Sequence, residues 1–140
     1  SEITFGDILP ERMASELAWV PVSNPGFWQM DMKDLLVNGE AMDLCRTGCQ
    51  VAFDTGTALL AGPSTKITRL LQRLRLAMDC SNFPTMPNIT FALAGGVNVE
   101  LTPQDYIEVA ADGCSLAMMN LNVPPPRGPL FILGDPVLRR

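Results

Sequence analysis

Short apolar runs, separated by polar residues and turn formers, recur along most of the chain. Alternating apolar and polar side chains are typical of half-buried strands, and short continuous apolar runs are typical of buried ones. This pattern predicts strands over residues 1–8, 17–22, 27–37, 49–54, 88–93, 97–101, 114–123 and 129–133. The alternation within 27–37 places Trp28, Met30 and Met32 on one face, and Gln29, Asp31 and Lys33 on the other.

Turn sequences join several of these predicted strands. Asn38-Gly39 follows the third strand, and both residues adopt positive φ readily, as a two-residue hairpin loop requires. Gly95-Gly96 separates the sixth strand from the fifth and predicts a second hairpin. Pro124-Pro125-Pro126 predicts a stiff extended loop before the last strand.

One segment, from about residue 64 to residue 78, has the periodicity of an amphipathic helix. Its apolar stripe consists of Ile67, Leu70, Leu71, Leu74 and Met78. Its basic residues lie off the stripe, which favours a solvated face over an anion site. A shorter helix or turn is expected over 101–107, and Gly134-Asp135-Pro136 predicts a turn before a further helix start. The chain is therefore predicted to be mostly β with one main helix.

Composition narrows the functions of such a domain. Hydrophobic residues make up 47% of the 140 residues, enough for a packed core. The net charge of -5 disfavours nucleic acid and anionic membrane surfaces as partners. The sequence has no histidine, which excludes Ser-His and Cys-His catalysis and removes the usual ligand of zinc. No apolar run approaches the length of a membrane span.

Four cysteines occur in the sequence, and their spacing fits a zinc site poorly. Disulfides are therefore favoured over free or metal-bound thiols, with Cys45 paired to Cys49 and Cys80 paired to Cys114 as the preferred connectivity. Disulfides indicate an oxidising compartment. Asn88 begins an N-glycosylation sequon, which makes it a candidate glycosylation site and agrees with the secretory pathway.

Asp54 is an acidic residue with apolar segments on both sides. A carboxylate in such a place costs free energy unless it is hydrogen-bonded. Phosphoryl acceptance is disfavoured because no lysine follows Asp54, and metal binding because the other aspartates are scattered. Two interpretations stay open: a plain turn with an Asx hydrogen bond, and one half of a carboxylate pair that activates water. In the second interpretation, Gly56 lets a backbone N–H approach the Asp54 carboxylate, and the hydroxyls of Thr55 and Thr57 fix its orientation.

Five stretches, in order along essentially the whole chain, resemble the C-terminal lobe of a pepsin-like aspartic protease. They are SEITFGDI, LAWVPV with FWQMDMKDLLVNGE, CRTGCQVAFDTGTALLAGPS, PNITFALAGGVNVELTPQDYI and FILGDPVLRR. Asp-Thr-Gly alone is a weak motif, but in register with the paired cysteines and Ile-Leu-Gly-Asp it is strong. The resemblance implies one lobe of a bilobal, β-barrel-like fold, and its cysteine pairing is the one preferred above.

The resemblance also implies roles for individual residues. Asp54 would be one of two catalytic aspartates, which cleave a polypeptide substrate at acidic pH through an activated water, without a metal or a cofactor. Thr55 would reach the opposite lobe, Gly56 would lie against the substrate, and Thr57 would hydrogen-bond Asp54. The strand that crosses the Asp54 loop and holds it would be formed by Ile132, Leu133 and Gly134.

One lobe cannot form the carboxylate pair. A single Asp-Thr-Gly is present, so the N-terminal lobe would come from the same parent chain or from a second chain. Both ends of the sequence read as interrupted. The prediction is therefore a C-terminal lobe over residues 1–140 that is cut before the family's final strands. This lobe is expected to be inactive alone. Ala58 stands where the family usually has serine. The alternative is a catalytically inactive, pepsin-like peptide-binding protein. The expected location is extracellular or an acidic endolysosomal or vesicular compartment.

Overall fold

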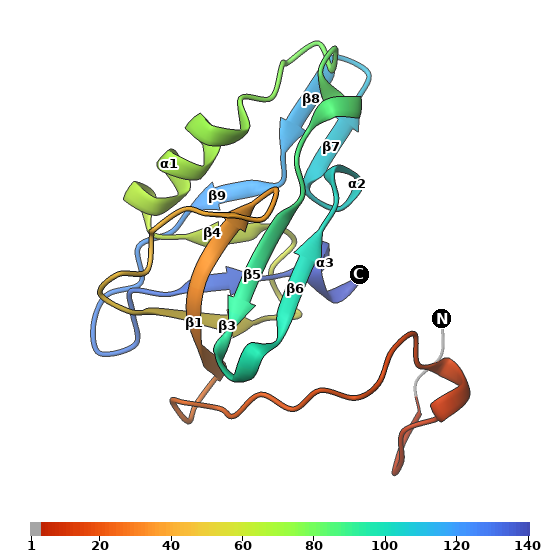
Figure 1. Ribbon diagram of the computed structural model, residues 1–140, viewed down its shortest axis with the longest axis vertical. Helices are drawn as coiled ribbons and strands as arrows, with labels where there is room; N and C mark the ends of the chain where they lie inside the picture. Colours follow the sequence, from red (N-terminus) through yellow and green to blue (C-terminus); the bar gives the residue numbers. More distant parts are fainter. Residues whose placement is uncertain (1–3) are drawn as a thin grey trace.

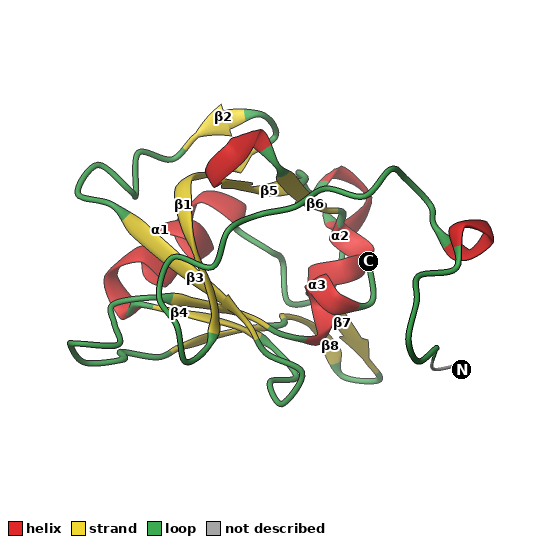
Figure 2. Cartoon of the chain, turned by 90° about the horizontal axis from the view of Figure 1, so that it is seen from below, coloured by secondary structure: helices red, strands yellow, loops and turns green. Residues whose placement is uncertain are grey.

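The computed structural model describes residues 4–140 and is mostly β, as predicted. Its main sheet has eight strands in the order β6-β5-β1-β3-β10-β4-β9, with β2 paired to β1, and β7 and β8 form a separate hairpin. The strands are β1 (Trp28–Val37), β2 (Glu40–Ala41), β3 (Cys49–Phe53), β4 (Leu60–Gly62), β5 (Ile89–Leu93), β6 (Asn98–Leu101), β7 (Ile107–Ala110), β8 (Gly113–Leu116), β9 (Met118–Asn120) and β10 (Phe131–Leu133). The α-helices are α1 (Ser64–Leu74), α2 (Pro103–Tyr106) and α3 (Asp135–Leu138). In Figure 2, α1 lies toward the left of the view, and α2 and α3 lie close together toward the right.

Both predicted hairpins are confirmed. Val37 pairs with Glu40 across the two-residue loop, in which Asn38 and Gly39 have φ values of 53° and 80°. Positive φ at both loop residues matches the twist of the flanking strands. Strands β5 and β6 pair antiparallel around Gly95-Gly96.

The burial that the alternation in β1 predicts is wrong at its first two residues. The Trp28 side chain is 73% exposed, whereas Gln29 is fully buried. Residues before the strand fold back against its start, through a bridge between Asn24 and Gln29 and a hydrogen bond from the Ser23 N–H to Gln29 O. The Gln29 amide donates a hydrogen bond to the Gln50 side chain on β3. A sequence window cannot show which neighbour covers a strand end.

The predicted strand over 17–22 is absent, and so is the described part, residues 4–8, of the one predicted over 1–8. Residues 1–3 of that prediction lie outside the described residues. The segment from residue 4 to residue 27 runs away from the sheet and contains one 3-10 turn at Pro10–Arg12 (Figure 1). Since no strand lies alongside to supply a hydrogen-bond ladder, its alternating pattern does not produce a strand.

The main helix forms where predicted but ends four residues early, at Leu74. Arg75 takes the left-handed conformation, with φ 50° and ψ 49°, and its backbone N–H caps Leu71 O. A left-handed residue after the last turn ends a helix. Ile67, Leu70 and Leu74 are buried, whereas Met78 lies beyond the helix and is 83% exposed.

The basic face of α1 is exposed at Arg69 and Arg73, as the pattern indicates, and Lys66 is half-buried. Its three cations reach alternate residues of β2 and the segment that follows it. The contacts are Lys66 Nζ to Leu44 O, Arg69 to Met42 O, and Arg73 to the Glu40 carboxylate. These side chains therefore connect α1 to the chain that leads into β3.

The stretch 114–123, predicted as one strand, is divided between β8 and β9. At Ala117, between them, the N–H donates to Tyr106 O and the carbonyl accepts the Leu60 N–H, so the chain passes here from the β7–β8 hairpin to the main sheet. Tyr106 is fully buried at the end of α2 and donates its hydroxyl to Pro87 O. Burial raises the pKa of Tyr106 to about 12. The structure contains both disulfides in the preferred pairing, Cys45–Cys49 and Cys80–Cys114.

Candidate active site

The turn that carries Asp54 is framed by three strands. Strand β3 leads into it and β4 leads out of it, and β10 lies between the two. Leu133 of β10 pairs parallel with Phe53 and antiparallel with Leu60, and its carbonyl accepts the Asp54 N–H at 3.1 Å. Leu133 and Leu60 are buried. The turn is thus attached at both ends to a packed sheet, which fixes the position of its aspartate.

The Asp54 carboxylate is held by the turn itself. Its Oδ1 accepts the Gly56 N–H at 2.9 Å, and its Oδ2 accepts the Thr57 hydroxyl at 2.6 Å. The Thr57 N–H also donates to Asp54 O at 3.3 Å, which closes the turn. A Cβ on Gly56 would stand 3.3 Å from Asp54 Oδ1, so glycine gives the amide its close approach. The first of these bonds is an Asx turn, so the hydrogen bonds by themselves do not decide between the two open interpretations.

These hydrogen bonds set the electrostatics of the site. The Thr57 hydroxyl, and after it the Gly56 amide, lower the pKa of Asp54 below the ordinary value, while slight desolvation opposes them. Donors that point at a carboxylate stabilise its ionised form. Asp54 is therefore an aspartate that loses its proton easily in this chain.

Gly134 is required where β10 passes the turn. An added Cβ would stand 1.9 Å from Thr57 O and 2.6 Å from Leu59 O, closer than non-bonded atoms approach. Just beyond it, the Asp135 N–H donates to Thr57 O at 2.9 Å. The backbone after β10 thus packs directly on the turn. Gly134 and Leu133 contact the turn as the sequence prediction requires, and Ile132 lies beside them, paired with Ala52 of β3.

An open groove of about 720 Å³ begins at Asp54 and Thr55. Its walls are mainly apolar and come from three distant parts of the chain. They include Val22, Phe27, Trp28, Val123, Leu130 and Leu138. None of these was among the predicted site residues, since no local motif marks them. In the structure, three of them stand out because they are apolar, exposed and beside the Asp54 carboxylate. Trp28 is 73% exposed, Phe27 47% and Leu138 42%.

The described residues also bear on whether the chain has a metal site, a membrane span or a glycosylation site. Among residues 4–140, no three acidic or cysteine side chains gather in a way that could hold a metal ion. No helix in that range has the length and apolar character of a membrane span. Asn88 is half-buried before β5, and Thr90 of its sequon is 8% exposed. Glycosylation of Asn88 stays a prediction.

Comparison with known proteins identifies the family. Residues 1–140 match the family described as eukaryotic aspartyl protease. The chain belongs to this family of pepsin-like proteases.

Several named relatives support this assignment. Cathepsin E-A of Xenopus laevis is 39% identical over 142 residues, which cover 96% of this chain and 35% of that protein. Cathepsin E of Mus musculus is 38% identical over 100% of this chain and 38% of its own length. Pepsin A of Canis lupus familiaris is 34% identical, again over 100% of this chain and 38% of its own length. The chain thus spans little more than a third of the relatives it matches.

Proposed function

We propose that this chain is the C-terminal lobe of an aspartic endopeptidase and that Asp54 is one of its two catalytic aspartates. The observation that carries the proposal is the Asp54 turn, with a doubly hydrogen-bonded carboxylate at the edge of an apolar groove. Family membership favours this interpretation over a plain Asx turn. The groove would receive a polypeptide substrate. The second aspartate would come from an N-terminal lobe, in the same parent chain or in a second chain.

The reaction would be attack of a water molecule on the peptide carbonyl. Two aspartates close together share one proton, so that one accepts a proton from the water and the other protonates the carbonyl oxygen. The donors from Thr57 and Gly56 suit Asp54 to be the ionised member of the pair. The pH optimum would be acidic because the other carboxyl must stay protonated. The secretory pathway or an acidic endolysosomal compartment would suit this chemistry.

The exposed Thr55 side chain supports an opposing lobe. It lies at the groove and has no hydrogen-bond partner among the described residues. A second lobe that brings its own turn against this one would supply such a partner. It would also cover apolar side chains that the groove leaves exposed.

The test uses the longer protein in which this lobe is joined to an N-terminal one. We expect Asp54→Asn to lower kcat for an acid-pH peptide substrate by about 100-fold or more, while Asp112→Asn in the exposed β7–β8 turn leaves it unchanged. The 140-residue chain alone should have no activity. Full activity of the Asp54→Asn variant would contradict the proposal. Acid-dependent binding of a peptide inhibitor without cleavage would instead identify a peptide-binding protein.

A further inference from the structure

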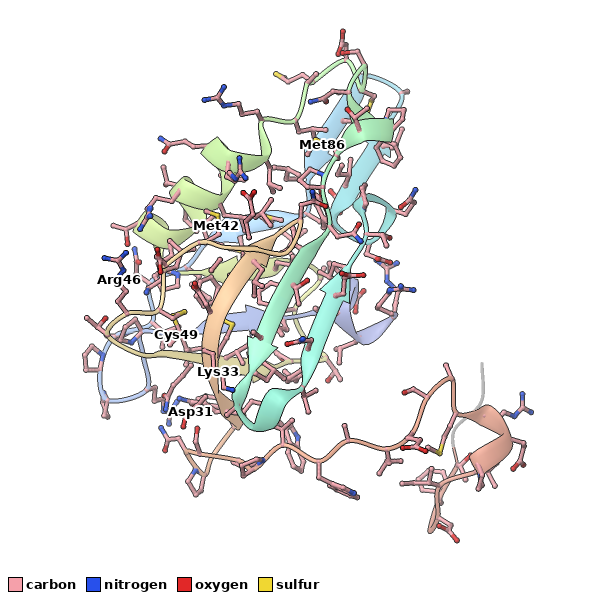
Figure 3. The ribbon with its side chains drawn as sticks, viewed as in Figure 1. Asp31, Lys33, Met42, Arg46, Cys49 and Met86 are labelled. Atoms are coloured by element: carbon pink, nitrogen blue, oxygen red, sulfur yellow. A yellow bond between two sulfur atoms is a disulfide. The ribbon has the colours of Figure 1, made fainter. Side chains whose placement is uncertain are left out.

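The Cys45–Cys49 disulfide lies beside a partly buried cation. Lys66 Nζ, on the first turn of α1, is 3.4 Å from Cys49 Sγ and donates a hydrogen bond to Leu44 O. Burial lowers the pKa of Lys66, and the Asp34 carboxylate opposes that effect. Figure 3 shows Cys49, Arg46 and Met42 on the α1 side of β1. The ammonium group is thus held against one particular sulfur of the pair.

We propose that Cys45–Cys49 is a thiol-exchange site, at which a thiol reductant attacks Cys45 and Cys49 leaves as a thiolate paired with Lys66. A neighbouring cation stabilises a thiolate, and a sulfur with a more stable thiolate leaves faster. The contact with Lys66 therefore distinguishes the two sulfurs, although their exposed fractions are nearly equal, at 8% for Cys45 and 7% for Cys49.

The electrons and protons balance with a dithiol as reductant. One reductant thiolate forms a bond to Cys45 Sγ, the disulfide bond breaks, and its electron pair stays on Cys49 Sγ. The second thiolate of the same reductant molecule then attacks the reductant sulfur that is bonded to Cys45. Cys45 is released by this step. The reductant becomes a cyclic disulfide and the protein gains two electrons. Of the two reductant protons, one ends on Cys45 and the other goes to solvent, since Cys49 stays ionised.

The second disulfide lacks these features. Among the described residues, no basic side chain contacts the sulfur of Cys80 or Cys114. The two cysteines are 34 positions apart, against 4 for Cys45 and Cys49. Opening a longer loop returns more entropy to the unfolded chain, so this bond contributes more to the stability of the fold. The two disulfides are therefore assigned different roles, one exchangeable and one structural.

The other charged side chains near Lys66 make hydrogen bonds or ion pairs with groups other than the Cys49 sulfur. Asp34 accepts the backbone N–H groups of Asp43 and Leu44 at 2.7 and 3.0 Å. Arg46 pairs with the Asp43 carboxylate at 3.0 Å. Arg69 contacts Met42 O. Since Arg69 lies on the same helix face but does not contact sulfur, it offers a matched control.

The experiment measures reduction of each disulfide in the folded 140-residue chain. Dithiothreitol is added near neutral pH, samples are alkylated over time, and peptide mass spectrometry reports each cysteine. Cys45–Cys49 should open before Cys80–Cys114, and Lys66→Gln should slow its opening about fivefold. Lys66→Arg and Arg69→Gln should leave the rate close to that of the original chain. Equal or faster opening in Lys66→Gln would overturn the proposal.

A second measurement does not depend on a variant that folds. Limiting glutathione, a monothiol, is added to the unmodified chain and the mixed disulfide is located. Glutathione should be attached at Cys45, with Cys49 free to alkylate. Attachment mainly at Cys49, or reduction of Cys80–Cys114 first, would overturn the assignment of Cys49 as the leaving sulfur.

Discussion

Two segments border the apolar groove, and they are held in opposite ways. The Asp54 turn is enclosed by β3, β10 and β4, and its backbone and side chains bond to one another. The segment from residue 4 to residue 27 forms no strand, and it exposes Phe5 to 89% and Trp19 to 82%. Strands were predicted in both places, over 49–54 before the turn and over 1–8 and 17–22 in the N-terminal part of the chain. What separates them is a neighbouring strand that supplies hydrogen bonds along its length.

The difference separates a turn that is held by hydrogen bonds within the chain from a segment that leaves apolar side chains exposed. The Asp54 carboxylate has its hydrogen bonds within the chain, from the Gly56 N–H and the Thr57 hydroxyl. The N-terminal segment leaves large apolar side chains, Phe5 and Trp19 among them, in water. This agrees with the proposal that a second lobe covers this side of the molecule.

The largest expected effect comes from crowding the turn. Gly134→Ala should lower the free energy of unfolding by about 3 kcal/mol, because the new methyl group would meet the carbonyls of Thr57 and Leu59. Urea denaturation followed by circular dichroism measures this. Gly96→Ala is the control: its φ is 84° and its Cβ would meet no atom within 4 Å, so about 1 kcal/mol is expected. Equal losses would mean that Gly134 does not hold the turn.

The next effect tests the hydroxyl that holds the carboxylate. Thr57→Val should raise the pKa of Asp54 toward its ordinary value and cost about 1 kcal/mol of stability, because the bond to Oδ2 is lost. A carbon-detected NMR titration of the Asp54 carboxyl group measures the pKa. Thr57→Ser keeps the hydroxyl and should keep the lowered pKa. An unchanged pKa in the valine variant would show that Thr57 is not its main cause.

A smaller effect appears in the pH dependence of stability. Since the pKa of Asp54 is lower in the folded chain than in the unfolded one, its ionised form contributes stability above the ordinary pKa. That contribution is lost as pH falls through the folded-state value. Between about pH 5 and about pH 2, Asp54→Asn should therefore lose less stability than the unmodified chain. Urea midpoints at both pH values measure this, with Asp112→Asn as a control. Parallel losses in the original chain and Asp54→Asn would refute it.

The smallest effect is expected in the N-terminal segment. Trp19→Ser should change the free energy of unfolding by no more than about 0.5 kcal/mol, because the side chain is 82% exposed. Leu133→Ala, at a fully buried position beside the turn, should cost about 3 kcal/mol in the same assay. A large loss for Trp19→Ser would mean that the segment packs on the body in solution.

Much of the fold could be predicted because its signals are local. Asn38-Gly39 specifies its hairpin through positive φ, and the apolar stripe of α1 identifies a helix. The end of α1 could not be predicted, since Arg75 takes a left-handed conformation without the glycine that usually marks one. The exposure of Trp28 and the burial of Gln29 at the start of β1 do not follow from its alternating pattern.

The candidate site, like the fold, has a part that the sequence predicts and a part that it does not. The hydrogen bonds of Asp54 to Gly56 and Thr57 span two and three residues, so a motif can specify them. The groove walls come from segments near residues 22–28, 123–130 and 138, which meet only in the folded chain. No local pattern relates such distant residues. The contact of Lys66 with Cys49 is likewise set by how α1 packs.

The passage of β10 between β3 and β4 has a consequence for how the chain folds. The Asp54 N–H bonds to Leu133, which follows it by about eighty residues. Contacts between such distant positions close large loops and form slowly. During synthesis, the aspartate leaves the ribosome long before the strand that fixes it. The Asp54 turn thus lacks its hydrogen bond to β10 until nearly all of these 140 residues have been made.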